Sequence, residues 1–158
     1  MEEIYRNNVL GIIFDNKGQI LIGKYNTSKP NWTFPKGGIE NNENLESAIF
    51  REVYEELGIS ANNLEILYYY KNEFVKNYTQ EEIEWKIKNK GEYYVGKKEK
   101  AILIKYKGNE TEINLNISKE FSEYKFIKIF DILQYINDNN LLNYINLDFL
   151  VNKINSFI

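Results

Sequence analysis

The sequence predicts an α/β fold in which a mixed β-sheet lies between helices. Strand-like runs occur before and after one strongly amphipathic helical segment, and further helical segments follow near the C-terminus. No internal repeat or linker divides the chain. Its 158 residues suffice for one domain with a substantial core, so we expect a single domain over residues 1–158.

The first two strands are expected to form a hairpin. Residues 9–14 and 19–24 are rich in apolar and β-branched residues, and the segment Asp15-Asn16-Lys17-Gly18 between them favours a turn. Residues 27–31 are predicted to be a loop. After the helix described next, the long apolar run 64–70 predicts another strand.

The central helix is predicted to lie between residue 44 and Gly58. Its apolar residues recur every three or four positions and form one stripe, made of Leu45, Ile49, Val53 and Leu57. Residues 42–44 supply capping side chains at its start, and Gly58 is typical of a helix end. The stripe should face the core, which leaves the acidic side of the helix facing a cleft.

The segments after residue 80 are less regular. Residues 81–90 fit either a helix or a strand, because Ile83, Trp85 and Ile87 alternate as they would in a strand. Further strands are predicted at 101–106 and 125–129, and C-terminal helices at 131–137 and 141–158.

Three glutamates lie on one face of the central helix. Glu52 is three and four residues from Glu55 and Glu56, so the carboxylates are neighbours, and the only cation in the helix is Arg51, which we expect to pair with one of them. Two carboxylates about 4 Å apart repel by roughly 1 kcal/mol in water and about 4 kcal/mol at an effective dielectric constant near 20. A hard cation removes this penalty, and carboxylate oxygens suit Mg²⁺ or Mn²⁺.

A solvated acidic surface helix is the alternative explanation, because like-charged pairs on an exposed helix cost only about 0.2–0.5 kcal/mol. Gly37 and Gly38 favour the metal site, since glycines let backbone carbonyls and amides approach an ion or a phosphate closely. From these residues alone, both explanations remain open.

The composition excludes several kinds of chemistry. The chain has no cysteine, which rules out disulfides, thiolate catalysis and cysteine-ligated metals. It has no histidine, so acid–base chemistry must use a carboxylate, lysine, tyrosine or metal-bound water. The net charge of −3 argues against extended nonspecific nucleic-acid binding. No apolar run reaches membrane-spanning length, and we expect a cytoplasmic protein with no membrane partner.

The segment around the helix resembles the Nudix box. From Gly37 there are five residues to Glu43 and seven more to Arg51-Glu52-Val53-Tyr54-Glu55-Glu56-Leu57-Gly58-Ile59, so every fixed position of the motif is filled. The resemblance implies the Nudix α/β/α sandwich with a mixed central β-sheet, and hydrolysis of a nucleoside diphosphate linked to another group. It also implies the metal ligands Glu52, Glu55 and Glu56, with the Gly37 carbonyl as an additional one.

Four further segments resemble the RNA pyrophosphohydrolase and dinucleoside polyphosphate hydrolase branch of this superfamily. They are Tyr5–Val9, Trp32–Ile39, Gly96–Lys100 and Glu120–Phe126. The branch has glutamines at the positions of Lys36, Lys97 and Glu99, and Pro-Gly at Asn41-Asn42. Among non-glycine residues asparagine enters positive φ most readily, so we expect the loop shape to be kept.

The resemblance also suggests residues for catalysis and substrate binding. The candidate catalytic carboxylates are Glu56, Glu120 and Glu55, of which Glu56 or Glu120 is the candidate general base. Arg6 and Lys100 occupy positions that match the branch, and Lys36 and Lys98 are further candidates for phosphate contacts. A solvated strand face is the alternative for any single lysine between residues 86 and 107.

Three functions remain open from the sequence. The first is an RNA 5′-pyrophosphohydrolase, and the second is a dinucleoside polyphosphate (Ap4A-type) or nucleoside triphosphate hydrolase. The third is a non-catalytic module that senses nucleotides. All three have a nucleotide or an RNA 5′ end as partner, and the oligomeric state, monomer or dimer, is left open.

Overall fold

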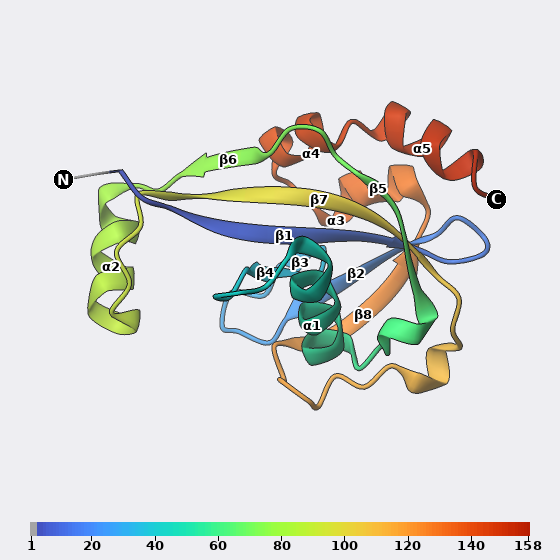
Figure 1. Cartoon of the computed structure of the whole chain (residues 1–158), viewed down its shortest axis with the longest axis horizontal. Coiled ribbons are helices and arrows are strands. Elements are labelled where there is room, and N and C mark those ends of the chain that lie inside the picture. The colour runs from blue at the N-terminus through green and yellow to red at the C-terminus, as the bar shows by residue number, and fades with distance from the viewer. Residues whose placement is uncertain (1–2) are drawn as a thin grey trace.

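The computed structural model describes residues 3–158 as one β-sheet flanked by helices (Figure 1). Residues 1 and 2 of the expected domain lie outside the described residues. The strands are β1 (Tyr5–Phe14), β2 (Ile20–Tyr25), β3 (Trp32–Thr33), β4 (Lys36–Gly38), β5 (Leu64–Tyr69), β6 (Phe74–Asn77), β7 (Gly96–Tyr106) and β8 (Phe121–Ile127). The helices are α1 (Leu45–Leu57), α2 (Gln80–Lys90), α3 (Ile132–Tyr135), α4 (Asn139–Ile145) and α5 (Leu147–Asn155).

The sheet is mixed, as predicted. β1 and β7 run parallel, from Tyr5 opposite Gly96 to Phe14 opposite Lys105. The other neighbours are antiparallel in the order β3-β2-β1-β7-β5, and β4, β6 and β8 pair with β1, β7 and β2. The expected strand 101–106 was too short, because β7 begins at Gly96 and includes the lysine-rich residues before it.

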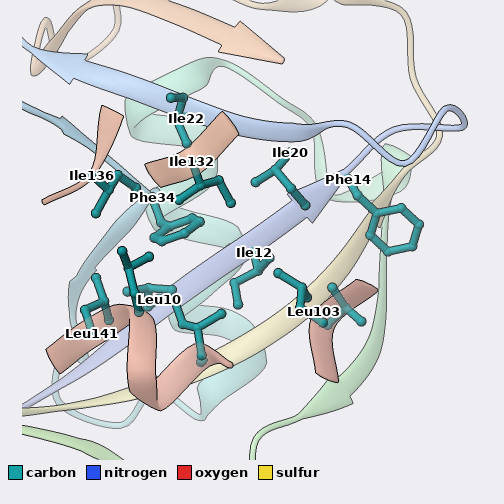
Figure 2. Packing of buried hydrophobic residues seen from close by; sticks show 14 of the residues in the cluster. Leu10, Ile12, Phe14, Ile20, Ile22, Phe34, Leu103, Ile132, Ile136 and Leu141 are labelled. Atoms are coloured by element: carbon teal, nitrogen blue, oxygen red, sulfur yellow. The ribbon is translucent and has the colours of Figure 1, made fainter. Parts of the chain in front are cut away.

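Each face of the sheet carries its own hydrophobic core. Successive residues of β1 point to opposite faces, so Val9 and Ile13 pack in the core on the α1 side. Leu10, Ile12 and Phe14 pack in the core that includes the C-terminal helices (Figure 2). Figure 1 shows α1 and the pair α4–α5 on opposite sides of β1 and β7. The predicted arrangement of a sheet between helices is confirmed.

The capping region and the glycine end predicted for the central helix are confirmed. α1 spans Leu45–Leu57; the Asn44 side chain accepts a hydrogen bond from the Ser47 N–H at its start, and Gly58 ends it with φ 72°. In the preceding loop Asn42 has φ 68°, the left-handed conformation that we expected an asparagine to provide. Ile49, Val53 and Leu57 of the apolar stripe are buried in the core, and the partly buried Leu45 packs against it. This packing fixes which face of α1 carries the glutamates.

The segment that fitted either a helix or a strand forms α2. Thr79 and Glu82 make a reciprocal capping box at its start, and Gly91 ends it with φ 64°. No residue of α2 is buried. The helix stands beyond one end of the sheet, next to β6 (Figure 1). It is therefore held by its caps and by few tertiary contacts.

Several predicted bounds were wrong. The expected helix 141–158 is divided into α4 and α5 at Asn146, which has φ 58° and accepts a hydrogen bond from the Phe149 N–H. The helix expected over 131–137 is reduced to the short α3. Strand β6 was not expected, and β8 begins at Phe121 rather than at residue 125. Within residues 3–158, none of the helices has both the length and the apolar character needed to cross a bilayer.

Candidate functional site

An open cleft of about 490 Å³ is formed by residues of β1, β2, β4, α1, α2 and β7. It brings together five residues that the sequence selected, namely Arg6, Lys36, Gly37, Glu52 and Glu120. The cleft also contains lysines that the sequence did not select as substrate contacts, namely Lys86, Lys90 and Lys97. The site therefore combines carboxylates with a larger group of cations than we expected.

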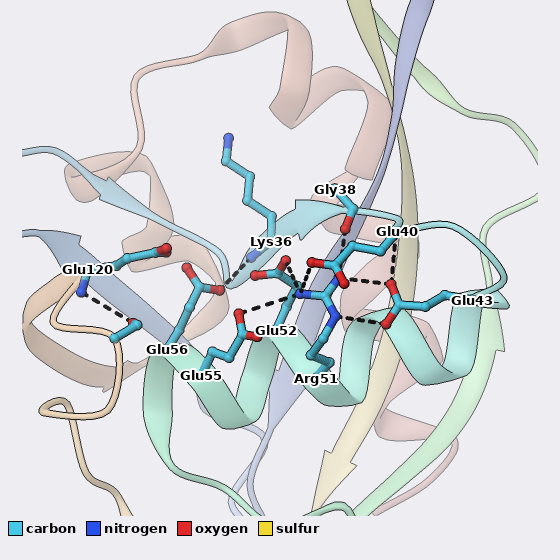
Figure 3. A network of polar contacts seen from close by, with 10 residues as sticks. Lys36, Gly38, Glu40, Glu43, Arg51, Glu52, Glu55, Glu56 and Glu120 are labelled. Atoms are coloured by element: carbon cyan, nitrogen blue, oxygen red, sulfur yellow. Dashed lines mark hydrogen bonds and ion pairs between the residues drawn. The ribbon is translucent and has the colours of Figure 1, made fainter. Parts of the chain in front are cut away.

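The three glutamates of α1 differ in their surroundings. Glu56 is 1% exposed and Glu52 is 8% exposed, whereas the Glu55 side chain is 41% exposed. Glu56 accepts a hydrogen bond from the Lys36 N–H at 3.0 Å, and its other carboxylate oxygen has no partner among residues 3–158. Burial, followed by the negative charge of Glu120, raises the pKa of Glu56 to about 10. Figure 3 shows Glu120 beside Glu56.

Arg51 contacts more carboxylates than predicted. It donates two hydrogen bonds to Glu43, at 2.7 and 2.9 Å, and others to Glu52 at 2.8 Å and Glu55 at 3.4 Å (Figure 3). A further bond of 2.8 Å reaches the Gly38 carbonyl. The expectation that Arg51 pairs with one carboxylate was wrong, because its planar guanidinium has five N–H donors that reach several acceptors at once. Arg51 thus holds the glycine loop, the helix and Glu43 together.

Gly37 and Gly38 let two functional side chains approach the β4 backbone. A Cβ atom on residue 37 would overlap the carboxylate of Glu52, and one on residue 38 would overlap the guanidinium of Arg6. A side chain at position 37 would therefore displace Glu52, and one at position 38 would displace Arg6.

The site meets part of what a divalent cation requires. Its donors are hard carboxylate oxygens, which suit Mg²⁺ or Mn²⁺, and the unpartnered oxygen of Glu56 is a buried acceptor free to bind an ion. Over residues 3–158, however, no three acidic side chains converge closely enough to hold a metal. In this arrangement Arg51 already contacts Glu52 and Glu55. A bound ion would compete with Arg51 for these oxygens.

Lys36, Lys97 and Glu99 form a charged cluster at the edge of the cleft. The Lys97 ammonium lies 3.2 Å from a Glu99 carboxylate oxygen, and the Lys36 ammonium lies 3.9 Å from the same oxygen. Burial, with the positive charge of Lys36, lowers the pKa of Lys97 to about 8. These three residues occupy the three glutamine positions of the branch, which the sequence could not show to be in contact.

The structure does not bring Lys98 and Lys100 into this cleft. The Lys98 ammonium lies over the Tyr5 ring, 5.1 Å from its centre, and the Lys100 ammonium donates a hydrogen bond to the Lys71 carbonyl at 3.0 Å. Side chains alternate along a strand, so Lys97 faces the cleft while its neighbours face away. Arg6 in β1 lies opposite Lys97 in β7. This pairing, together with the alternation of side chains, is the signal that could have identified Lys97 as a residue of the cleft.

The family model of the NUDIX domain matches residues 4–145. The chain belongs to the NUDIX domain family. An RNA pyrophosphohydrolase from Wolbachia pipientis subsp. Culex pipiens is 33% identical over 141 residues, which cover 84% of this chain and 80% of that protein. An RNA pyrophosphohydrolase from Pasteurella multocida is 32% identical over 128 residues. That match covers 80% of this chain but 63% of the relative, so the NUDIX chain spans less than two thirds of its length.

Solved structures agree with the NUDIX fold. A binary complex of the C. elegans Ap4A hydrolase superposes with a TM-score of 0.65 and 21% identity, covering 96% of each chain. The E. coli dihydroneopterin triphosphate pyrophosphohydrolase superposes with a TM-score of 0.66 and 16% identity, covering 95% of this chain and 99% of that one. At these identities the likeness shows the fold alone.

Proposed function

We propose that this NUDIX protein hydrolyses a pyrophosphate bond at the 5′ end of RNA, converting a triphosphate to a monophosphate with Mg²⁺ or Mn²⁺. The observation that carries the proposal is the cleft, where glutamates face five cations: Arg6, Lys36, Lys86, Lys90 and Lys97. A triphosphate is strongly negative, and cations placed beside the carboxylates neutralise the phosphates that the glutamates would otherwise repel.

The metal would be held by Glu52, Glu55 and Glu56, with the Gly37 carbonyl as an additional ligand. When bound, the ion neutralises phosphate charge and makes a nearby water more acidic. Because its pKa is raised, the Glu56 carboxyl group is protonated at neutral pH in the metal-free protein. It would have to lose this proton to bind the ion. Arg51 would keep its hydrogen bonds to Glu43 and to the Gly38 carbonyl, and these would hold the loop in place.

The chain supplies the remaining steps through its own side chains. Glu56 or Glu120 accepts the proton of the attacking water, whose oxygen bonds to phosphorus as the bridging P–O bond breaks and pyrophosphate leaves. Arg6, Lys36 and Lys97 hold the phosphates in position. Tyr25 lines the same cleft, and burial together with nearby glutamates raises its pKa, so it stays a neutral hydrogen-bond donor.

Two observations favour RNA over a smaller nucleotide. The relatives at 32% and 33% identity are named RNA pyrophosphohydrolase. In addition, Lys86 and Lys90 are four residues apart on α2, so they share one helix face and extend the cations of the cleft, which suits the phosphodiester backbone that continues beyond the first nucleotide of an RNA. An Ap4A-type or nucleoside triphosphate hydrolase, using the same glutamates, is the alternative. The complete glutamate set argues against a purely sensing module.

Comparison of substrates tests the proposal. The protein is incubated with Mg²⁺ and, separately, with 5′-triphosphorylated RNA, diadenosine tetraphosphate and free nucleoside triphosphates. We expect kcat/KM to be highest for the RNA, with a 5′-monophosphate product. Faster turnover of diadenosine tetraphosphate would support the alternative, and no product from any substrate would support the sensing module.

A further inference from the structure

A second cavity, of about 270 Å³, adjoins the cleft. Lys36 and Lys97 line both spaces and form the boundary between them. Most residues that line the second cavity are polar or charged, but one part of its wall is made of the aromatic and apolar side chains of Trp32, Phe74, Tyr135 and Leu141. The Trp32 and Tyr135 rings meet edge to face, with centres 5.5 Å apart. Aromatic side chains are common stacking partners of nucleobases.

One polar side chain in this cavity is buried without adequate partners. Glu99 is 1% exposed, and both of its ion pairs, with Lys97 and Lys36, use the same oxygen, Oε2. Neither carboxylate oxygen accepts a hydrogen bond from any residue between 3 and 158. Buried acceptors are normally satisfied, so the exception calls for an explanation. A ligand with hydrogen-bond donors would provide partners for the two oxygens of the Glu99 carboxylate.

We propose that this cavity binds a nucleobase of the substrate and that Glu99 selects guanine. An ionised carboxylate only accepts hydrogen bonds. Guanine carries two adjacent donors, the N1–H and the 2-amino group, which match the two carboxylate oxygens. Adenine and cytosine place an acceptor beside their amino group, and uracil has one donor between two acceptors. Guanine is therefore the common base that a carboxylate can bind through two parallel hydrogen bonds.

The shared lysines connect this base site to the cleft. The inference rests on the proposed function, because the phosphates of the same nucleotide would occupy the cleft while its base occupies the cavity. Lys36 and Lys97 cover the carboxylate of Glu99 in the ligand-free protein. Phosphates in the cleft attract both ammonium groups and so open the carboxylate to the base, whose two donors then replace the lysine contacts.

The competing explanation is that Glu99 only positions the two lysines. The two explanations differ for a ligand without a base. If Glu99 reads guanine, Glu99→Gln lowers the affinity for guanine nucleotides but not for inorganic tripolyphosphate. If Glu99 only holds the lysines, the same substitution weakens both ligands by the same factor.

Binding of nucleoside monophosphates tests the inference independently of hydrolysis, since these ligands contain no pyrophosphate bond. The chain has two tryptophans, and Trp85→Phe leaves Trp32 as a fluorescent reporter in the cavity wall. We expect GMP to bind about tenfold more tightly than AMP, with IMP, which lacks the 2-amino group, in between. In Glu99→Gln the GMP-to-AMP ratio is expected to fall to about one, while tripolyphosphate binding is maintained.

Three results would overturn the inference: equal affinity of the unsubstituted protein for GMP and AMP, a guanine preference that survives Glu99→Gln, or equal weakening of GMP and tripolyphosphate. The first of these needs no variant at Glu99, so it remains decisive if Glu99→Gln fails to fold. Guanine preference in a protein that hydrolyses no RNA would support the base site and refute the proposed function.

Discussion

Replacing Glu56 with glutamine is expected to lower kcat for 5′-triphosphorylated RNA by about 10³-fold or more. Glu56 is buried, accepts the Lys36 N–H and has a free carboxylate oxygen beside Glu120. Glutamine has nearly the same size and still accepts the Lys36 N–H. It can neither accept a proton from water nor supply a negative charge to a metal. Steady-state rates at saturating Mg²⁺ measure the loss.

The same variant should fold at least as well as the unsubstituted protein in a chelator. The pKa of Glu56 is raised to about 10 in the folded state, whereas the pKa of a glutamate in the unfolded chain is about 4.3. Between these values the folded state binds more protons, so stability falls as pH rises through this window. Glutamine removes this cost at pH 7, and thermal melting in EDTA should therefore show an unchanged or higher midpoint.

A matched control is available on the same helix. Glu46 is exposed in the first turn of α1, and Glu46→Gln should leave kcat within about twofold. A Glu56→Gln protein that melts normally and turns over at a near-normal rate would contradict the assignment.

Gly37→Ala is expected to lower kcat/KM by about 100-fold and to raise the Mg²⁺ concentration needed for half-maximal activity. The added methyl group would overlap the Glu52 carboxylate. Glu52 would have to move away from β4. Its carboxylate would then leave the position from which it is proposed to bind the ion together with Glu55 and Glu56. Activity measured across a Mg²⁺ titration tests this expectation.

Gly38→Ala is the matched comparison, because its methyl group would overlap the guanidinium of Arg6 instead. We expect that variant to raise KM for RNA with little change in the Mg²⁺ dependence. If Gly37→Ala and Gly38→Ala shift the Mg²⁺ dependence equally, the glycine at position 37 has no special relation to the metal site.

The parts of the fold that the sequence predicted well are those with local signals. The stripe of α1, its Asn44 cap and its Gly58 end are all encoded within a few residues of the helix. The same kind of signal was present for α2, whose Thr79–Glu82 capping box and Gly91 end indicate a helix. The alternation of Ile83, Trp85 and Ile87 obscured it, because α2 has no buried face whose spacing would show a helix.

The site was harder to predict because it depends on long-range pairing. Aligned motifs indicate which residues matter, but not which face of a strand they occupy. Lys97 faces Glu99, Lys36 and the cleft, whereas Lys98 and Lys100 face away, and the pairing of β7 with β1 determines which face of the strand meets the cleft. The extent of the Arg51 contacts likewise depends on how the loop folds back to place Gly38 and Glu43 beside it.

The central claim, that the glutamates of α1 hold a divalent cation, is tested most directly by Mn²⁺ binding. Electron paramagnetic resonance measures free Mn²⁺ as it is titrated into the protein, with proton release followed in a weakly buffered solution. We predict saturable binding that Mg²⁺ displaces, with proton release at pH 7 as Glu56 ionises, and much weaker binding to Glu56→Gln. A protein that binds no Mn²⁺, or that hydrolyses RNA ends at full rate in EDTA, would contradict the claim.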